Sequence, residues 1–139
     1  MTGCIQRKTE LFLVGKLKSL VPECKHVPYA GGSLNEDADS LEPPFSVTSA
    51  SGAENVLQNE STWKITGSTQ VLAHASEMSS HVHSELAAKV YGLLKNLDPD
   101  WSDPTFAFHG IDITGQREAT DEDSKCHATI IDWVAGTGG

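Results

Sequence analysis

Residues 76–97, SEMSSHVHSELAAKVYGLLKNL, decide how the rest of the chain must be arranged. Large apolar residues recur here at spacings of four, four, three and four, which is the period of an amphipathic α-helix. They are Val82, Leu86, Val90, Leu93 and Leu97, and Ala87 and Leu94 widen the stripe. Ser76 or Ser79 can cap the start of this helix, and Asp98-Pro99 ends it. We expect the apolar stripe to pack against a sheet.

Two segments before this helix have the two-residue period of strands with one buried face. In residues 45–51, Phe45 and Val47 alternate with small polar residues, and the same alternation runs through residues 63–72. The polar stretch between them is long enough for a hairpin loop or a wider excursion. We therefore predict strands at 45–51 and 63–72.

Two β-rich runs after the helix, residues 105–113 and 126–135, predict a closing hairpin. The connection between them is polar and acidic, beginning at Thr114-Gly115. Residues 136–139 are predicted to be a flexible tail.

The first of these runs contains an interruption at His109-Gly110. Phe106 and Phe108 share one parity along the run, whereas Ile111 and Ile113 share the other. A β-bulge restores the alternation by adding one residue to the strand, so we predict a bulge at this point.

The first part of the chain is predicted to be a helix over residues 9–21, ended by Pro22, with Gly15 weakening it. Residues 26–30 are consistent with a short strand, and Pro28 would place that strand at a sheet edge. Residues 31–44 are acidic and rich in glycine and proline, which predicts a loop. This loop is either a solvated connection or a binding segment that orders on a partner.

Together these elements predict an α+β fold in a single domain spanning residues 1–139. Strands broken by one long amphipathic helix favour a mostly antiparallel sheet, of about four to five strands, with two helices packed on one face. A chain of 139 residues with 38% apolar residues is long enough for one core.

The charge of the chain is uneven. The formal net charge is −9, yet residues 1–25 hold five bases and two acids. Nucleic-acid binding would need nearly all ten bases on one surface, so it is not favoured. Three widely spaced cysteines indicate a reducing compartment, and the apolar run at residues 11–14 is too short to cross a membrane. We expect synthesis in the cytoplasm and no membrane partner.

A metal site is conceivable around His74, His81 and His83. On a helix, residues 81 and 83 point about 200° apart, so they cannot chelate one ion, although Glu77, His81 and Glu85 follow each other at steps of four. The sequence lacks the H-E-x-x-H and C-x-x-C signatures. We therefore predict a solvated helix face, no metal and no cofactor.

Catalytic patterns are also weak. The sequence contains no G-x-S-x-G and no phosphate-binding glycine loop. Asp112 and Asp132 would form a carboxylate pair if their strands were neighbours, and one pKa would then rise. The plainer interpretation is that each faces solvent or another subunit. We predict no catalytic, cofactor-binding or metal residues, and no enzyme.

The order of elements resembles the tail terminator proteins of long-tailed bacteriophages. The likeness rests on the helix 9–21, the turn and strand at 21–29, the acidic loop before Pro43-Pro44-Phe45, the strand 63–72, the helix 76–97 and the final hairpin. The His-rich start of the long helix departs from the pattern. The resemblance implies a structural virion protein that forms a homo-oligomeric, hexameric ring.

Such a ring would cap the tail tube and join it to the head. Its partners would be the tail tube protein, the head-neck connector proteins and phage DNA that passes through without specific binding, and it would be assembled in the host cytoplasm. An acidic channel wall would let a polyanion slide. The competing hypotheses are another neck, minor tail or head-completion protein, a small metal-dependent enzyme using the His81 region, and a monomeric immunity- or adaptor-like binding module.

Overall fold

A computed structural model describes residues 2–22, 24–28, 45–55, 62–74, 77–103, 105–121 and 126–138. The elements follow in the order α1 (Thr2–Leu20), β1 (Lys25–Pro28), β2 (Phe45–Asn55), β3 (Thr62–His74), α3 (Glu77–Lys95), β4 (Asp100–Asp103), β5 (Phe106–Asp121) and β6 (Cys126–Gly138). The predicted loop 31–44 and the predicted cap Ser76 lie outside the described residues.

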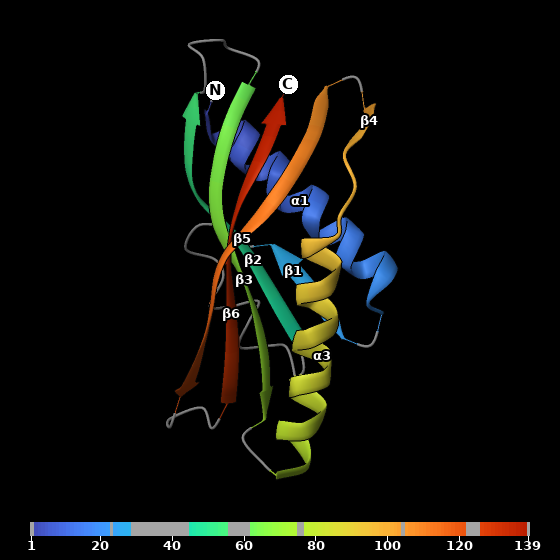
Figure 1. Ribbon diagram of the computed structural model, residues 1–139, viewed down its shortest axis with the longest axis vertical. Coiled ribbons are helices and arrows are strands. Elements are labelled where there is room, and N and C mark those ends of the chain that lie inside the picture. Colours follow the sequence, from blue (N-terminus) through green and yellow to red (C-terminus); the bar gives the residue numbers. More distant parts are fainter. Residues whose placement is uncertain are drawn as a thin grey trace.

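The strands form one mixed sheet in the order β1-β2-β3-β6-β5-β4 (Figure 1). Among the described strands, only the edge strand β1 pairs in parallel, with β2, and the other described pairs are antiparallel. The α+β class and the edge position of Pro28 agree with the sequence analysis. The expected number of four to five strands is wrong, because β4 adds a sixth.

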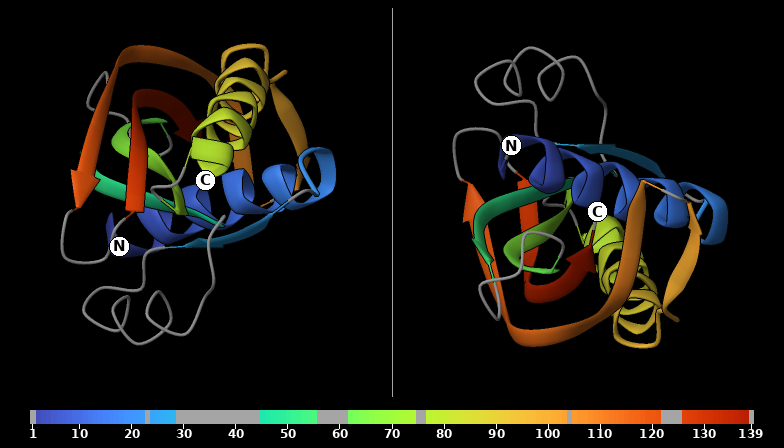
Figure 2. Two further views of the ribbon diagram at one scale, coloured as in Figure 1. Left: turned by 90° about the horizontal axis from the view of Figure 1, so that it is seen from below. Right: turned by 90° about the horizontal axis from the view of Figure 1, so that it is seen from above.

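Both helices lie on the concave face of the curled sheet (Figure 2). α1 contacts β1 and β2, whereas α3 contacts β3, β5 and β6. The buried faces of the two helices meet the inner face of the sheet in one hydrophobic core. Its members with no exposed surface include Leu13, Leu17, Ile65, Val71, Val90, Leu94, Ile131 and Trp133.

The helix α3 follows the apolar stripe that predicts it. Leu86 (4% exposed), Val90 and Leu94 are buried, and Leu93 is only partly buried at the margin of the core. Leu94 therefore contributes more to the core than Leu93. Neither α1 nor α3, as far as they are described, has the length and apolar character needed to cross a bilayer.

The final hairpin is longer than predicted. Strand β5 continues through Thr114-Gly115 to Asp121, because a second register shift between Ile113 and Gly115 keeps its pairing with β6. Strand β6 includes residues 136–138, where a tail was expected, because these residues pair with both β3 and β5. The predicted bulge is confirmed by the register shift between Phe108 and Gly110.

Candidate functional site

The two aspartates considered for a carboxylate pair lie on neighbouring strands but do not face each other. Asp112 is opposite Val134, and Asp132 is opposite Gly115. The carboxylate of Asp132 instead lies 3.3 Å from Nε of Arg117, in a partly exposed ion pair. Hence the register does not place these two carboxylates opposite each other as the predicted pair.

The histidines considered for a metal site lie on α3 and at the end of β3, and the side chains of His74, His81 and His83 are outside the described part of the structure. The helix does include residues 81 and 83, as predicted. Among the side chains that are described, no group of three or more His, Cys, Asp or Glu residues is placed to hold a metal ion.

His26 is the buried histidine of the described residues, and it has a structural role. Its Nε2 donates to the carbonyl oxygen of Val21 at 2.6 Å, and its Nδ1 lies 2.5 Å from Oγ of Ser46. With 1% of its surface exposed, it joins the end of α1 to strands β1 and β2. Both ring nitrogens are occupied by these contacts, so the geometry does not present a free base.

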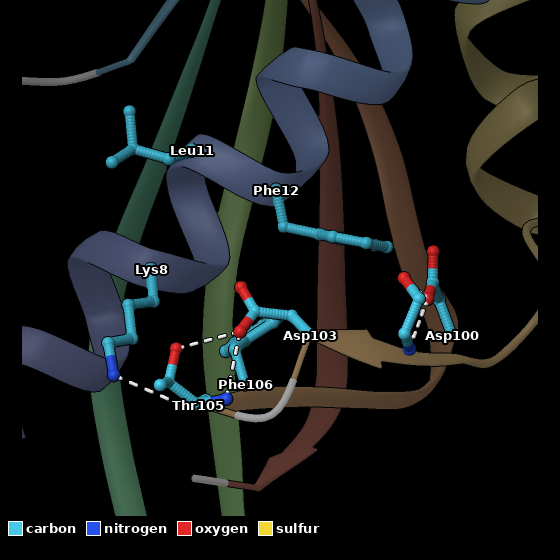
Figure 3. Close-up of a pocket in the computed structure, with 8 residues that line it drawn as sticks. Lys8, Leu11, Phe12, Asp100, Asp103, Thr105 and Phe106 are labelled. Carbon is cyan, nitrogen blue, oxygen red and sulfur yellow. Dashed lines mark hydrogen bonds between the residues drawn. The ribbon is translucent and has the colours of Figure 1, made fainter.

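A pocket of about 460 Å³ lies between α1 and the edge strand β4 (Figure 3). We call it the α1–β4 pocket. Phe12 points from α1 toward the β4 side, and its ring lies 5.5 Å from the ring of Phe106. The lining consists of Lys8, Leu11, Phe12, Asp100, Ser102, Asp103, Thr105 and Phe106. The pocket thus has an aromatic floor and a polar rim.

The polar rim is held together by hydrogen bonds within the chain. Asp103 accepts hydrogen bonds from the amide and the hydroxyl of Thr105, both at 2.8 Å, and these bonds lower the pKa of Asp103. The hydroxyl and amide of Ser102 lower the pKa of Asp100 in the same way. Both carboxylates are therefore ionised at neutral pH.

Two lysines of α1 lie close to the rim, and Lys8 is the one of them that lines the pocket. Nζ of Lys8 donates to the carbonyl oxygen of Thr105 at 3.2 Å, and Nζ of Lys16 lies 3.5 Å from Asp100 (Figure 3 shows the Lys8 bond). Because these groups neutralise one another, the pocket carries no strong excess of charge. An apolar side chain of another molecule suits such a pocket better than a charged substrate.

Strand β4 is a protected sheet edge. It is four residues long, its register with β5 is irregular, and the Asp100 side chain already accepts from the amide of Ser102. Short length, irregularity and charge all discourage uncontrolled pairing with another strand. At the opposite edge, Pro28 of β1 lacks an amide hydrogen. The chemistry of both edges favours contacts through side chains over strand addition.

An exposed tryptophan lies on β4, next to the pocket but not in its lining. Trp101 is 66% exposed, and its Nε1 donates to Nδ1 of His109 at 3.2 Å. A hydrogen bond that fixes a large exposed ring is typical of a contact residue, because little side-chain freedom is then lost on binding. This neighbourhood of α1 and β4 is the candidate functional site, and its chemistry is that of an interaction surface.

No family model matches the sequence, and no curated protein matches it. Among the solved structures of similar fold is one chain of the virion of a native gene transfer agent particle. The TM-score is 0.53 at 13% identity, and the alignment covers 96% of this chain and 90% of that chain. At this identity the likeness concerns the fold, and it extends over nearly the whole length of both chains.

The amino-acid sequence alone does not predict this surface. The α1–β4 pocket joins residues almost 100 positions apart, and a single sequence gives no signal for such a contact. The one available signal was the segment 98–103, DPDWSD, in which a tryptophan lies among three aspartates. Of this segment, only Asp98-Pro99 enters the sequence prediction, as the end of the preceding helix.

Proposed function

We propose that this chain is a structural protein of a tailed-phage or phage-like virion. The observation that supports this function is the fold shared with a chain of the gene transfer agent virion over 96% of this chain. A candidate site made of an exposed aromatic residue and a mixed pocket is in keeping with an assembly subunit. The proposal therefore assigns the surface to contacts between proteins.

Within the virion, we propose the role of a tail terminator, a homo-oligomeric ring of six subunits that caps the tail tube and meets the head-neck proteins. Support comes from the sequence resemblance to that family and from the acidic net charge of −9, which suits a passage for DNA. The blunted edges of β1 and β4 suit a ring whose subunits meet through side chains.

The decisive experiment removes the protein from an assembling particle. If it is a tail terminator, electron microscopy of the resulting lysate will show tails of uncontrolled length or finished tails that do not join heads. Adding back the protein from a plasmid should restore joined particles. Normal infectious particles without the protein would refute a virion role.

A second measurement separates the terminator from other virion roles. Ring particles of about six subunits, seen by electron microscopy at high protein concentration or on the ends of tail tubes, are expected for the terminator. If unjoined tails of normal length accumulate without the protein, and the purified protein forms no ring on tail-tube ends, the protein is instead a head-completion protein. In that case the virion role stands and the terminator role does not.

A further inference from the structure

The solvent face of α1 carries a basic residue at each end, with an exposed leucine and a glycine between them. The guanidinium of Arg7 at one end also lies 3.6 Å from Glu10 of the same helix. Arg7, Leu11, Gly15 and Lys18 follow one another at steps of four, four and three, and all four are exposed. Leu11 is 48% exposed and provides the apolar contact. We call these four residues the α1 stripe.

Gly15 is the unusual member of the α1 stripe. A glycine inside a helix costs about 1 kcal/mol relative to alanine. A Cβ at this position would meet nothing within 4 Å, so packing within the described chain does not require glycine. Close approach of another molecule would require glycine, because glycine lets a bulky group lie against the helix backbone.

The segment of residues 98–103, DPDWSD, has the opposite character, and we call it the Trp101 strip. It holds the exposed Asp98 and Asp103 on either side of the exposed Trp101, which His109 fixes in place, whereas Asp100 is already paired with Lys16 of the same chain at 3.5 Å. Fully buried tryptophans at interfaces are among the residues that contribute most to binding. A fixed, exposed tryptophan between negative charges therefore calls for a flat, positively charged counterpart.

The two surfaces match in charge and in length. From Arg7 to Lys18 the helix rises about 16 Å, and from Asp98 to Asp103 the chain spans at most about 17 Å. The apolar contacts, Leu11 on the α1 stripe and Trp101 on the strip, lie between the charged ends in both cases.

We propose that the Trp101 strip of one copy of this chain docks on the α1 stripe of a second copy. Trp101 then packs over Gly15 and beside Leu11, and the aspartates at the ends of the strip face Arg7 and Lys18. The docking partner is a second copy because both complementary surfaces belong to this chain. Outside residues 1–25, which include the α1 stripe, the chain carries a net charge of −12, so α1 offers its basic surface.

The two surfaces adjoin, because Leu11 and Asp103 line the same pocket. Two copies that exchange the contact reciprocally form a two-fold pair, and copies that use it in one direction only build a ring when the rotation between subunits closes. A virion ring would use it between neighbours. The contact itself rests on the two surfaces and not on the virion assignment, so it is tested on the purified protein alone.

The first test compares sedimentation velocity of the wild type and variants over a range of concentrations at low salt. We expect the wild type to self-associate and Trp101→Ala to raise the dissociation constant about 30-fold or more. The matched control is Leu20→Ala. Leu20 is 60% exposed but lies nine residues from Leu11, about 180° around the helix, so this change should leave association unaltered.

The second test adds a side chain to the α1 stripe at Gly15, whereas the first removes one from the Trp101 strip. Gly15→Leu should preserve or raise the thermal midpoint, because leucine favours helix and a Cβ at this position meets no described residue within 4 Å. The same variant should raise the dissociation constant by a similar factor, and Lys18→Glu should weaken association most at low salt.

Two results would overturn the proposal. One is a wild type that stays monomeric up to about 1 mM, a concentration at which even weak specific contacts form. The other is self-association that Trp101→Ala and Gly15→Leu leave unchanged while circular dichroism shows both variants folded. Either result leaves the virion assignment untouched, since that assignment is decided by particle assembly.

Discussion

The indole ring of Trp133 on β6 occupies the space in which a side chain at position 67 of β3 would lie. A Cβ added to Gly67 would be 2.6 Å from Cη2 of Trp133, and it would also collide with the carbonyl oxygen of Ser49. Nε1 of Trp133 donates to Oγ1 of Thr69 at 3.1 Å, so the buried ring has a partner for its polar atom. The pair fixes where the largest core side chain sits.

Gly67→Ala should lower the free energy of unfolding by about 1–3 kcal/mol, because the new methyl group overpacks a site with no room. Urea unfolding followed by circular dichroism measures the change. Gly92→Ala is the matched control, since nothing lies within 4 Å of a Cβ at that helical position. We expect that control to be stabilised by about 1 kcal/mol, and equal effects at both positions would contradict the packing described.

Leu86→Ala should lower the free energy of unfolding by about 2–5 kcal/mol, because Leu86 belongs to the core and its removal leaves a cavity. Chemical denaturation gives this value directly. Leu20→Ala, at an exposed leucine, is expected to change it by less than about 0.5 kcal/mol. A loss below about 0.5 kcal/mol at Leu86 would mean that this face of α3 is not core.

Glu10 on α1 makes the stability of the protein depend on pH. Glu10 is 5% exposed and accepts a hydrogen bond from the amide of Ala50 at 3.0 Å. Burial raises its pKa above the ordinary value of 4.5, and the bond from Ala50 and the charge of Arg7 only partly oppose this. The folded chain therefore holds this proton more tightly than the unfolded chain does. The resulting stabilisation is complete below the unfolded pKa and is lost as pH rises through the folded one.

Glu10→Gln removes this titration while keeping a side-chain oxygen for Ala50. The free energy of unfolding of the variant, minus that of the wild type, should rise as pH increases from about 4 to 7. Asp100 and Asp103 titrate in both proteins, so their effects cancel in the difference. Denaturant titrations at each pH provide the measurement, and a difference that does not vary with pH would exclude the role of Glu10.

Asp103→Ala should loosen the turn between β4 and β5, because the amide of Thr105 loses its acceptor. Hydrogen exchange followed by mass spectrometry should show faster exchange in peptides covering residues 100–106. Since the pKa of Asp103 is lowered, the same loosening should develop in the wild type when acid protonates this carboxylate. Asp98→Ala serves as the control. Equal hydrogen exchange in the two variants would contradict the claim that Asp103 holds this turn in place.

Replacing His81 and His83 together with Gln should leave the thermal midpoint and the particle-assembly activity unchanged, because we expect both to face water. Elemental analysis of purified wild type should find no stoichiometric zinc, iron or manganese. A bound metal that is lost together with activity in the double variant would favour the metal-dependent enzyme.

Local patterns predicted most of the fold because they are tied to burial. The alternation around Ile65 and Val71 and the apolar stripe through Leu86 and Val90 each follow the side of the element that faces the core. On β2 the prediction of one buried face is wrong, because residues 45–48 are all buried and Ser46, not Phe45 or Val47, lies opposite Val71. The residues that were assigned wrongly show no apolar pattern that distinguishes a buried from an exposed side. Thr114 and Gly115 resemble a turn, and only their pairing with β6 makes them strand.

The candidate site was beyond prediction for a related reason. Strand β4 has exposed or partly exposed side chains throughout, so its sequence carries no apolar alternation. Lys8 and Thr105 meet only because α1 packs across the concave face of the sheet. The sequence therefore predicted most helices and strands, whereas the α1–β4 pocket depends on how these elements pack in three dimensions.

The place of β6 in the sheet has a consequence for the order of folding. This strand is paired on both sides, with β3 over thirteen consecutive positions and with β5, yet it is the last described strand to be synthesised. During translation, β3 must wait for a partner that emerges more than fifty residues later, from His74 to Cys126. Such distant pairing slows folding and leaves unpaired strands exposed in the meantime. A ribosome-bound chain that ends before residue 126 would thus hold two separated halves of a sheet.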